Sequence, residues 1–147
     1  MKPKILLRIA VFVTLFYAFG HIMGHLTRKQ TTDPSGKEVI RQMEQYKFNA
    51  NGYMRSWDDF YEALSLDSVI VLVGFAIICW MFSGMVEKYP RIVYKLLWPI
   101  LICFIGFTVT DYLYVFMIPT VTSLIICIVI IVAMIQIHKH PEYSLKG

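Results

Sequence analysis

Two histidines four residues apart are the first side chains in this sequence that could do chemistry. They stand in the repeated pairs Gly20-His21 and Gly24-His25. Residues four apart lie one turn above each other on the same face of a helix. Imidazole titrates near neutral pH and binds transition metals, so this spacing suits a proton relay or two ligands of a metal site. The two glycines share a neighbouring stripe, which predicts close packing against another helix.

Carboxylates elsewhere in the chain supply the partners that such histidines need. Asp58 and Glu62 are again one helical turn apart, and Asp111 follows the third apolar run. A metal bound by both histidines requires a third ligand, which Asp58 or one of the other two acids would provide. The candidates for acid–base catalysis are His21, His25, Glu62 and Asp111. These residues identify no particular cofactor.

Each of these residues also has a purely structural explanation. The histidines can bond to loop backbone or lie among lipid head groups. Asp58 and Asp59 can complement the dipole at a helix N-terminus, with Arg55 as a salt-bridge partner. Asp111 can mark a turn in water. The residues alone leave both explanations open.

Aromatic side chains flank the same positions and predict a belt at one membrane–water interface. Trp57 and Tyr61 could in addition stack on a bound ligand. The residues expected to bind a ligand at this end are Tyr17, His21, His25, Trp57, Asp58, Tyr61 and Glu62.

The composition is that of a membrane protein. Hydrophobic residues make up 57% of the 147 residues and charged residues 16%, with a mean hydropathy of +0.59. No basic cluster with interleaved aromatics lies outside the apolar runs, which argues against a nucleic-acid partner. The sequence also lacks a phosphate-binding glycine loop, a GxSxG nucleophile motif and a CxxC pair.

Four apolar runs are long enough to cross the hydrocarbon core as helices. They cover residues 5–26, 66–86, 94–110 and 119–137. The predicted fold class is therefore all-α, an integral membrane four-helix bundle that forms a single domain. The outer loop, 27–56, is expected to carry a short amphipathic helix over 37–49 on the membrane surface, which Asn51-Gly52 ends.

Local signals predict where the later helices begin and end. Ser56 and Asp59 resemble a capping box at the start of the second membrane helix. A tight aromatic turn is expected over 111–117, and Pro119 suits the first turn of the last helix. The count of Lys and Arg predicts the orientation: eight flank the N-terminal side of the membrane with two acids, and six lie on the outer side, where six acids lie between residues 33 and 62. Both termini are therefore expected to be cytoplasmic.

Three short stretches resemble a group of small, uncharacterised bacterial four-helix membrane proteins that are broadly DoxX-like. The stretches are Phe16-Tyr17-Ala18-Phe19-Gly20-His21 with Gly24-His25, Arg55-Ser56-Trp57-Asp58-Asp59-Phe60-Tyr61, and Tyr114-Val115-Phe116-Met117-Ile118-Pro119. The resemblance implies a four-helix bundle in the bacterial inner membrane. It implies no established reaction, substrate or cofactor.

Three functional hypotheses follow. The first is a protein that binds a lipid, a quinone-like molecule or a partner protein at an outward-facing polar pocket, a common setting for ligands between helices. The second is a membrane-embedded enzyme, an acid–base isomerase or a metal- or quinone-dependent oxidoreductase, that uses the two histidines with the carboxylates. The third is an accessory subunit of a membrane complex or a homo-oligomer, packed through Gly20 and Gly24.

Overall fold

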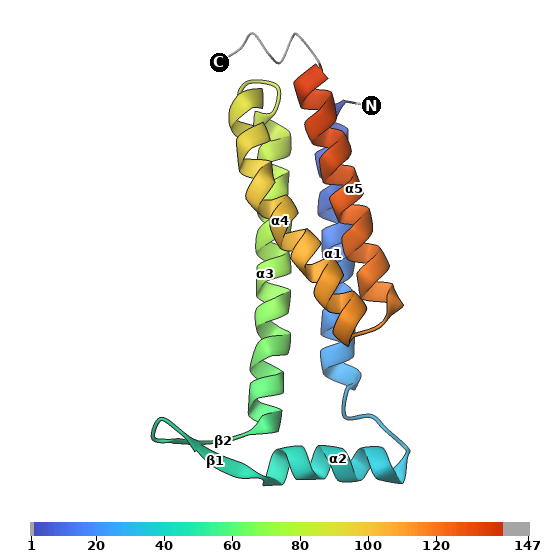
Figure 1. Ribbon diagram of the computed structural model, residues 1–147, viewed down its shortest axis with the longest axis vertical. Helices are drawn as coiled ribbons and strands as arrows, with labels where there is room; N and C mark the ends of the chain where they lie inside the picture. The colour runs from blue at the N-terminus through green and yellow to red at the C-terminus, as the bar shows by residue number, and fades with distance from the viewer. Residues whose placement is uncertain (1, 140–147) are drawn as a thin grey trace. The chain divides into compact units, whose positions relative to one another are not determined.

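The computed structural model describes residues 2–139 and has an all-α architecture with one small hairpin (Figure 1). Its elements, in chain order, are α1 (Pro3–Thr27), α2 (Pro34–Gln45), β1 (Lys47–Ala50), β2 (Tyr53–Ser56), α3 (Trp57–Met85), α4 (Pro90–Tyr114) and α5 (Met117–Lys139). The predicted all-α fold class is confirmed.

Four of the helices, α1, α3, α4 and α5, are long and apolar enough to cross a membrane. They contain 25, 29, 25 and 23 residues, so each exceeds the roughly 20 that the hydrocarbon core requires. Three of the four predicted spans fall within these helices, and the second, 66–86, extends one residue beyond the end of α3. The chain is a multi-pass membrane protein.

The start of α3 shows how a local signal places a helix end. The Asp59 carboxylate accepts a hydrogen bond from the Ser56 N–H at 2.7 Å, and the Ser56 hydroxyl accepts one from the Asp59 N–H at 3.1 Å. This reciprocal pair satisfies two backbone donors at a helix N-terminus that otherwise have no partner. The predicted capping box is confirmed.

The chain divides into two compact units. Of the described residues, the bundle unit contains 2–17 and 72–139, and the hairpin unit contains 18–71. In the bundle unit, α4 and α5 pack along each other, and the start of α1 and the end of α3 complete the four helices (Figure 1). Its fully buried side chains include Leu7, Leu97, Phe104, Ile126 and Ile130.

Aromatic and ionic contacts join the helices of the bundle unit. Phe75 on α3 lies 5.4 Å from Phe104 on α4, measured between ring centroids. The Arg8 guanidinium of α1 lies over the Trp80 ring of α3 at 5.2 Å. Aromatic pairs and cation–π contacts have preferred geometries, so they orient helices as well as attract them.

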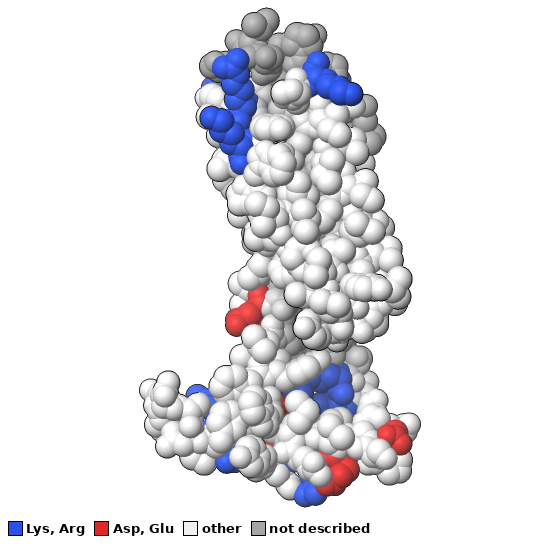
Figure 2. Space-filling view, viewed as in Figure 1, with Lys and Arg blue, Asp and Glu red and all other residues white. Residues whose placement is uncertain are grey.

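The outer surface of the bundle unit is largely apolar. Phe12 is 65% exposed and Ile102 is 62% exposed. Such exposure would be unfavourable in water, but lipid tails are as apolar as these side chains. Figure 2 shows a broad white surface over the helices, with Lys and Arg side chains gathered at one end of it.

The segment between α2 and α3 differs from the prediction. The surface helix ends at Gln45 instead of Asn49, and 47–56 form an antiparallel hairpin in which Ala50 pairs with Tyr53. Asn51 and Gly52 have φ values of +52° and +93°. Positive φ at both central residues is what a two-residue hairpin turn requires, and Asn-Gly is the commonest pair that supplies it. Asn51-Gly52 is therefore a hairpin turn, and its interpretation as a helix stop was wrong.

The connection between α4 and α5 also differs. The predicted turn over 111–117 is wrong because α4 continues to Tyr114 and α5 begins at Met117. Asp111 therefore lies inside a helix and is only 6% exposed. Pro119 falls in the first turn of α5, as predicted.

Candidate functional site

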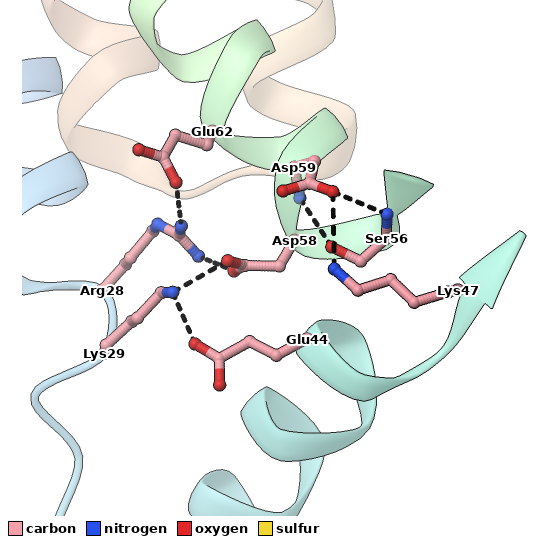
Figure 3. A network of polar contacts seen from close by, with 8 residues as sticks. All are labelled: Arg28, Lys29, Glu44, Lys47, Ser56, Asp58, Asp59 and Glu62. Atoms are coloured by element: carbon pink, nitrogen blue, oxygen red, sulfur yellow. Dashed lines mark hydrogen bonds and ion pairs between the residues drawn. The ribbon is translucent and has the colours of Figure 1, made fainter. Parts of the chain in front are cut away.

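An ionic network in the hairpin unit joins the loop after α1 to the start of α3 (Figure 3). The Arg28 guanidinium donates hydrogen bonds to the carboxylate of Asp58 and, at 3.4 Å, to that of Glu62. The Lys29 ammonium donates to Asp58 at 2.8 Å and to Glu44, in the last turn of α2, at 2.5 Å. Two cations from one loop thus bind three acids from two helices.

The centre of this network is partly withdrawn from water. The side chains of Arg28 and Asp58 are 13% and 9% exposed, whereas the Glu62 side chain is 50% exposed. Hydrogen bonds to the Asp58 carboxylate raise the pKa of both Arg28 and Lys29. Asp58 therefore keeps its charge and has two cationic partners, in agreement with the structural explanation that the sequence left open beside that of a metal ligand.

Arg55, the predicted salt-bridge partner of Asp58 and Asp59, interacts electrostatically with Asp59 but forms no ion pair within residues 2–139. Its guanidinium lies 5.8 Å from the centroid of the Tyr53 ring in β2. Arg28 takes the predicted role and also lies over the Tyr61 ring at 5.2 Å. The spacing along the chain favoured Arg55, but the pairing is made by residues about 30 positions apart.

The two histidines lie in the last part of α1 and are half-buried. The Nδ1 atom of His25 is enclosed and has no hydrogen-bond partner within residues 2–139. Within the same residues, there is no group of at least three His, Cys, Asp or Glu side chains that could hold a metal ion together. The described chain thus lacks the third ligand that a metal site at His21 and His25 would require.

The packing role predicted for Gly20 and Gly24 is not seen in the part of the chain that the structure describes. A Cβ atom placed on either glycine would meet nothing within 4 Å. Both residues are exposed. The stripe that they form on α1 is therefore exposed.

A second polar cluster lies within the bundle unit, among apolar side chains. The Tyr17 hydroxyl of α1 donates a hydrogen bond to the Asp111 carboxylate of α4. Ser123 of α5 donates to the same oxygen at 3.4 Å, and Thr108 of α4 donates to Ser123 at 3.0 Å. Tyr17 is 5% exposed and Ser123 is fully buried. Three helices therefore share one buried polar network, and the prediction that Asp111 marks a turn in water was wrong.

Such a cluster has a clear energetic role. Burying a polar group without a partner in an apolar interior costs several kcal/mol, by an order-of-magnitude estimate. Each hydrogen bond between two helices therefore stabilises the packing that brings its donor and acceptor together. One nearby group on the same helix as Tyr17 lacks such a bond: the buried Thr14 hydroxyl has no partner within residues 2–139. The polar chemistry inside the bundle unit is concentrated where α1, α4 and α5 meet.

A groove on the hairpin unit combines charged and apolar walls, and we call it the amphipathic groove. It has a volume of about 660 Å³ and is lined by Ala50, Tyr53, Arg55, Asp59, Phe60, Glu62, Ala63 and Leu66. Its charged residues come from β2 and the first turns of α3, and its apolar residues come from both strands of the hairpin and from α3. Glu62 is the one predicted ligand-binding residue among them.

Aromatic rings form the surface beside this groove. The ring centroids of Phe48 and Trp57 are 5.0 Å apart, and those of Phe48 and Phe60 are 5.6 Å apart. Trp57 also lines a neighbouring groove with Val39, Met43 and Tyr46 of the α2 side. Sequence reasoning missed Phe48 and the amphipathic groove because it missed the hairpin, although the Asn-Gly pair was a sufficient signal.

Comparison of the chain with protein-family models, with curated proteins and with solved structures gives no match. The functional interpretation therefore rests on the residues and their geometry.

We predict that the Tyr17–Asp111 hydrogen bond stabilises the bundle unit. Tyr17→Phe should lower the free energy of unfolding by about 1–2 kcal/mol, because it leaves a buried carboxylate short of its donor. Unfolding in mixed detergent micelles, followed by circular dichroism, measures this. Tyr112→Phe is the control, because Tyr112 is 70% exposed. Asp111→Leu added to Tyr17→Phe should restore part of the loss, and a further loss in the double variant would contradict the assignment.

We also predict that Arg28 holds the start of α3. Arg28→Gln should raise the hydrogen-exchange rate of the amides of 57–62, with an opening free energy lower by about 1.5–3 kcal/mol, the range for hydrogen bonds to charged groups. Lys47→Gln is the matched control, because the Lys47–Asp59 pair is 3.7 Å apart and half exposed. Equal exchange in the two variants would show that the network does not order this helix end.

Proposed function

We propose that this protein binds an amphiphilic ligand, a lipid or a quinone-like molecule, in the amphipathic groove. The observation that carries the proposal is that charged and apolar side chains line the same groove. Arg55 and Glu62 are among its charged residues, and Phe60, Ala63 and Leu66 form its apolar part. A molecule with a polar head and an apolar tail can contact both kinds of side chain at once.

The charged residues of the groove differ in the contacts that their side chains already make with other residues. Asp59 caps α3 and lies near Lys47, so its carboxylate is committed to the fold. Glu62 is half exposed and has one ionic contact, at 3.4 Å, to Arg28. The Arg55 guanidinium lies 5.8 Å from the centroid of the Tyr53 ring and, unlike that of Arg28, forms no ion pair within residues 2–139. Arg55 is therefore our candidate for binding a phosphate or carbonyl oxygen of the head group.

The position of the groove along α3 supports a ligand drawn from the membrane. Leu66, where its apolar part ends, is also where the apolar run of the second span begins. Trp57 and Phe60, exposed by 56% and 42%, are the aromatic residues expected at the level of the head groups. A lipid tail could pass from this groove into the hydrocarbon without crossing water.

We further propose that the membrane is the bacterial inner membrane and that the protein is of the DoxX-like kind its short motifs resemble. Both ends of the chain would be cytoplasmic. The cations near the α3–α4 connection support this: Lys88, Arg91 and Lys95 lie there, and the one acid, Glu87, is 3.3 Å from Lys4 of the N-terminal segment. An excess of Lys and Arg marks the cytoplasmic side of a span. Residues 140–147, which include Lys146, lie outside the described residues.

Filling the groove tests the proposed function. Ala63→Trp should reduce the amount of co-purified lipid or quinone by about tenfold, equivalent to about 1.4 kcal/mol, because an indole would occupy the apolar part. Native mass spectrometry of the protein in mild detergent, with mass spectrometry of the extracted ligand, measures this.

The control for this variant is Leu64→Trp, which adds the same ring to a neighbouring residue that is 66% exposed and outside the groove. Arg55→Gln then distinguishes the two ligand classes, because it should weaken the binding of a lipid with a phosphate head group more than the binding of a neutral quinone. An equal ligand content in both Trp variants would contradict the proposal.

Topology reporters test the proposed orientation. A fluorescent protein fused after Gly147 should fluoresce, because it folds in the cytoplasm. Alkaline phosphatase inserted in the hairpin turn after Gly52 should be active, because it matures outside. Phosphatase activity from a fusion after residue 88, in the α3–α4 connection, would reverse the assignment.

A further inference from the structure

The bundle unit has a second groove, between α4 and α5, that the proposed function does not use. It has a volume of about 260 Å³, and we call it the α4–α5 groove. Leu101 of α4 and Met134 of α5, both buried, form part of its wall together with Ile131 and Ile135. Four aliphatic side chains along two packed helices make a trough suited to an alkyl chain.

One end of this trough is aromatic and cationic. Tyr94, Trp98, His138 and Lys139 line it. The Tyr94 ring lies 6.1 Å from the His138 ring and 6.5 Å, edge to face, from the Trp98 ring. Amphipathic rings beside a lysine are the side chains that occur where lipid head groups meet the hydrocarbon.

The charges around this end have one sign. Of the described side chains that line the groove, Lys139 carries a full positive charge and none is acidic. Lys95, exposed, directly follows Tyr94 on α4, and Glu87, the one acid in the connection before α4, is bound to Lys4. An anionic head group is therefore attracted here and meets no unpaired carboxylate among the described neighbours.

We infer that the α4–α5 groove is a binding site for an anionic phospholipid from the leaflet at the basic end of the bundle unit. One acyl chain lies against Leu101 and Met134, and the phosphate accepts hydrogen bonds from Lys139. A zwitterionic lipid gains the same apolar contacts but less from the cations. The site therefore selects for the charge of the head group. This inference does not depend on the amphipathic groove, which lies on the hairpin unit.

Trp98 is a built-in reporter because it lines the groove and is 48% exposed. Trp57→Phe with Trp80→Phe leaves it as the single tryptophan. This variant is reconstituted in phosphatidylcholine vesicles that contain a minor fraction of lipid with brominated acyl chains, as phosphatidylglycerol or as phosphatidylcholine. Bromine quenches tryptophan on contact. We expect brominated phosphatidylglycerol to bind about fivefold more strongly than brominated phosphatidylcholine, the factor that one lysine supplies at about 1 kcal/mol.

Two further variants decide whether the groove is responsible. Lys139→Gln should abolish the preference, whereas Lys88→Gln should retain it, because Lys88 lies over the Tyr89 ring and outside the groove. Equal quenching by both brominated lipids would overturn the inference. Equal loss of preference in the two lysine variants would also overturn it, because it would indicate general attraction to a basic surface.

Native mass spectrometry keeps the inference testable if the tryptophan substitutions impair folding. The wild-type protein in mild detergent, supplied with equal amounts of phosphatidylglycerol and phosphatidylcholine, should retain one phosphatidylglycerol preferentially, and Lys139→Gln should not. Retention of both lipids in equal amounts by the wild type would overturn the inference. The amphipathic groove can fail its own test without affecting this one, because Ala63→Trp leaves the α4–α5 groove unchanged.

Discussion

The packing of the bundle unit depends on the need to pair one buried carboxylate. Asp111 lies among apolar helices and is 6% exposed, where an unpaired polar group is expensive. Tyr17 from α1 and Ser123 from α5 meet this need by donating to the same oxygen. Apolar contacts alone would leave helix rotations of similar energy, because lipid competes equally well for the same side chains. The hydrogen bonds select one of them.

In the hairpin unit, too, a carboxylate that is largely withdrawn from water is paired, here with cations. Arg28 and Lys29 bind Asp58, and Lys29 also binds Glu44 of α2. Exposed ion pairs contribute little, but Arg28 and Asp58 are largely withdrawn from water, and their interaction fixes the start of α3. Asp58 and Glu62, two of the candidate site acids, thereby pair with cations and order the residues beside the amphipathic groove.

The two grooves place amphiphilic surfaces on different units of the chain. In each, charged or polar side chains and apolar side chains line the same groove. The amphipathic groove has charges of both signs, whereas the α4–α5 groove has a positive charge only among the described side chains. This contrast follows from the distribution of Lys and Arg that sets the orientation of membrane helices. The same cations that would hold the basic end on one side of the membrane can also select the lipid found there.

The sequence by itself determined the four membrane helices, the capping box at Ser56 and the concentration of cations beside the α3–α4 connection. These features depend on hydropathy, on spacing within one or two turns and on neighbouring residues, all of which are local. Only the tertiary structure decided that Tyr17 pairs with Asp111, 94 positions away, and that Arg28 displaces Arg55 as the partner of Asp58. Such choices depend on which helix faces meet, and many faces have similar hydropathy. The hairpin lies between these cases, because Asn51-Gly52 is a local signal whose meaning depends on the strands that flank it.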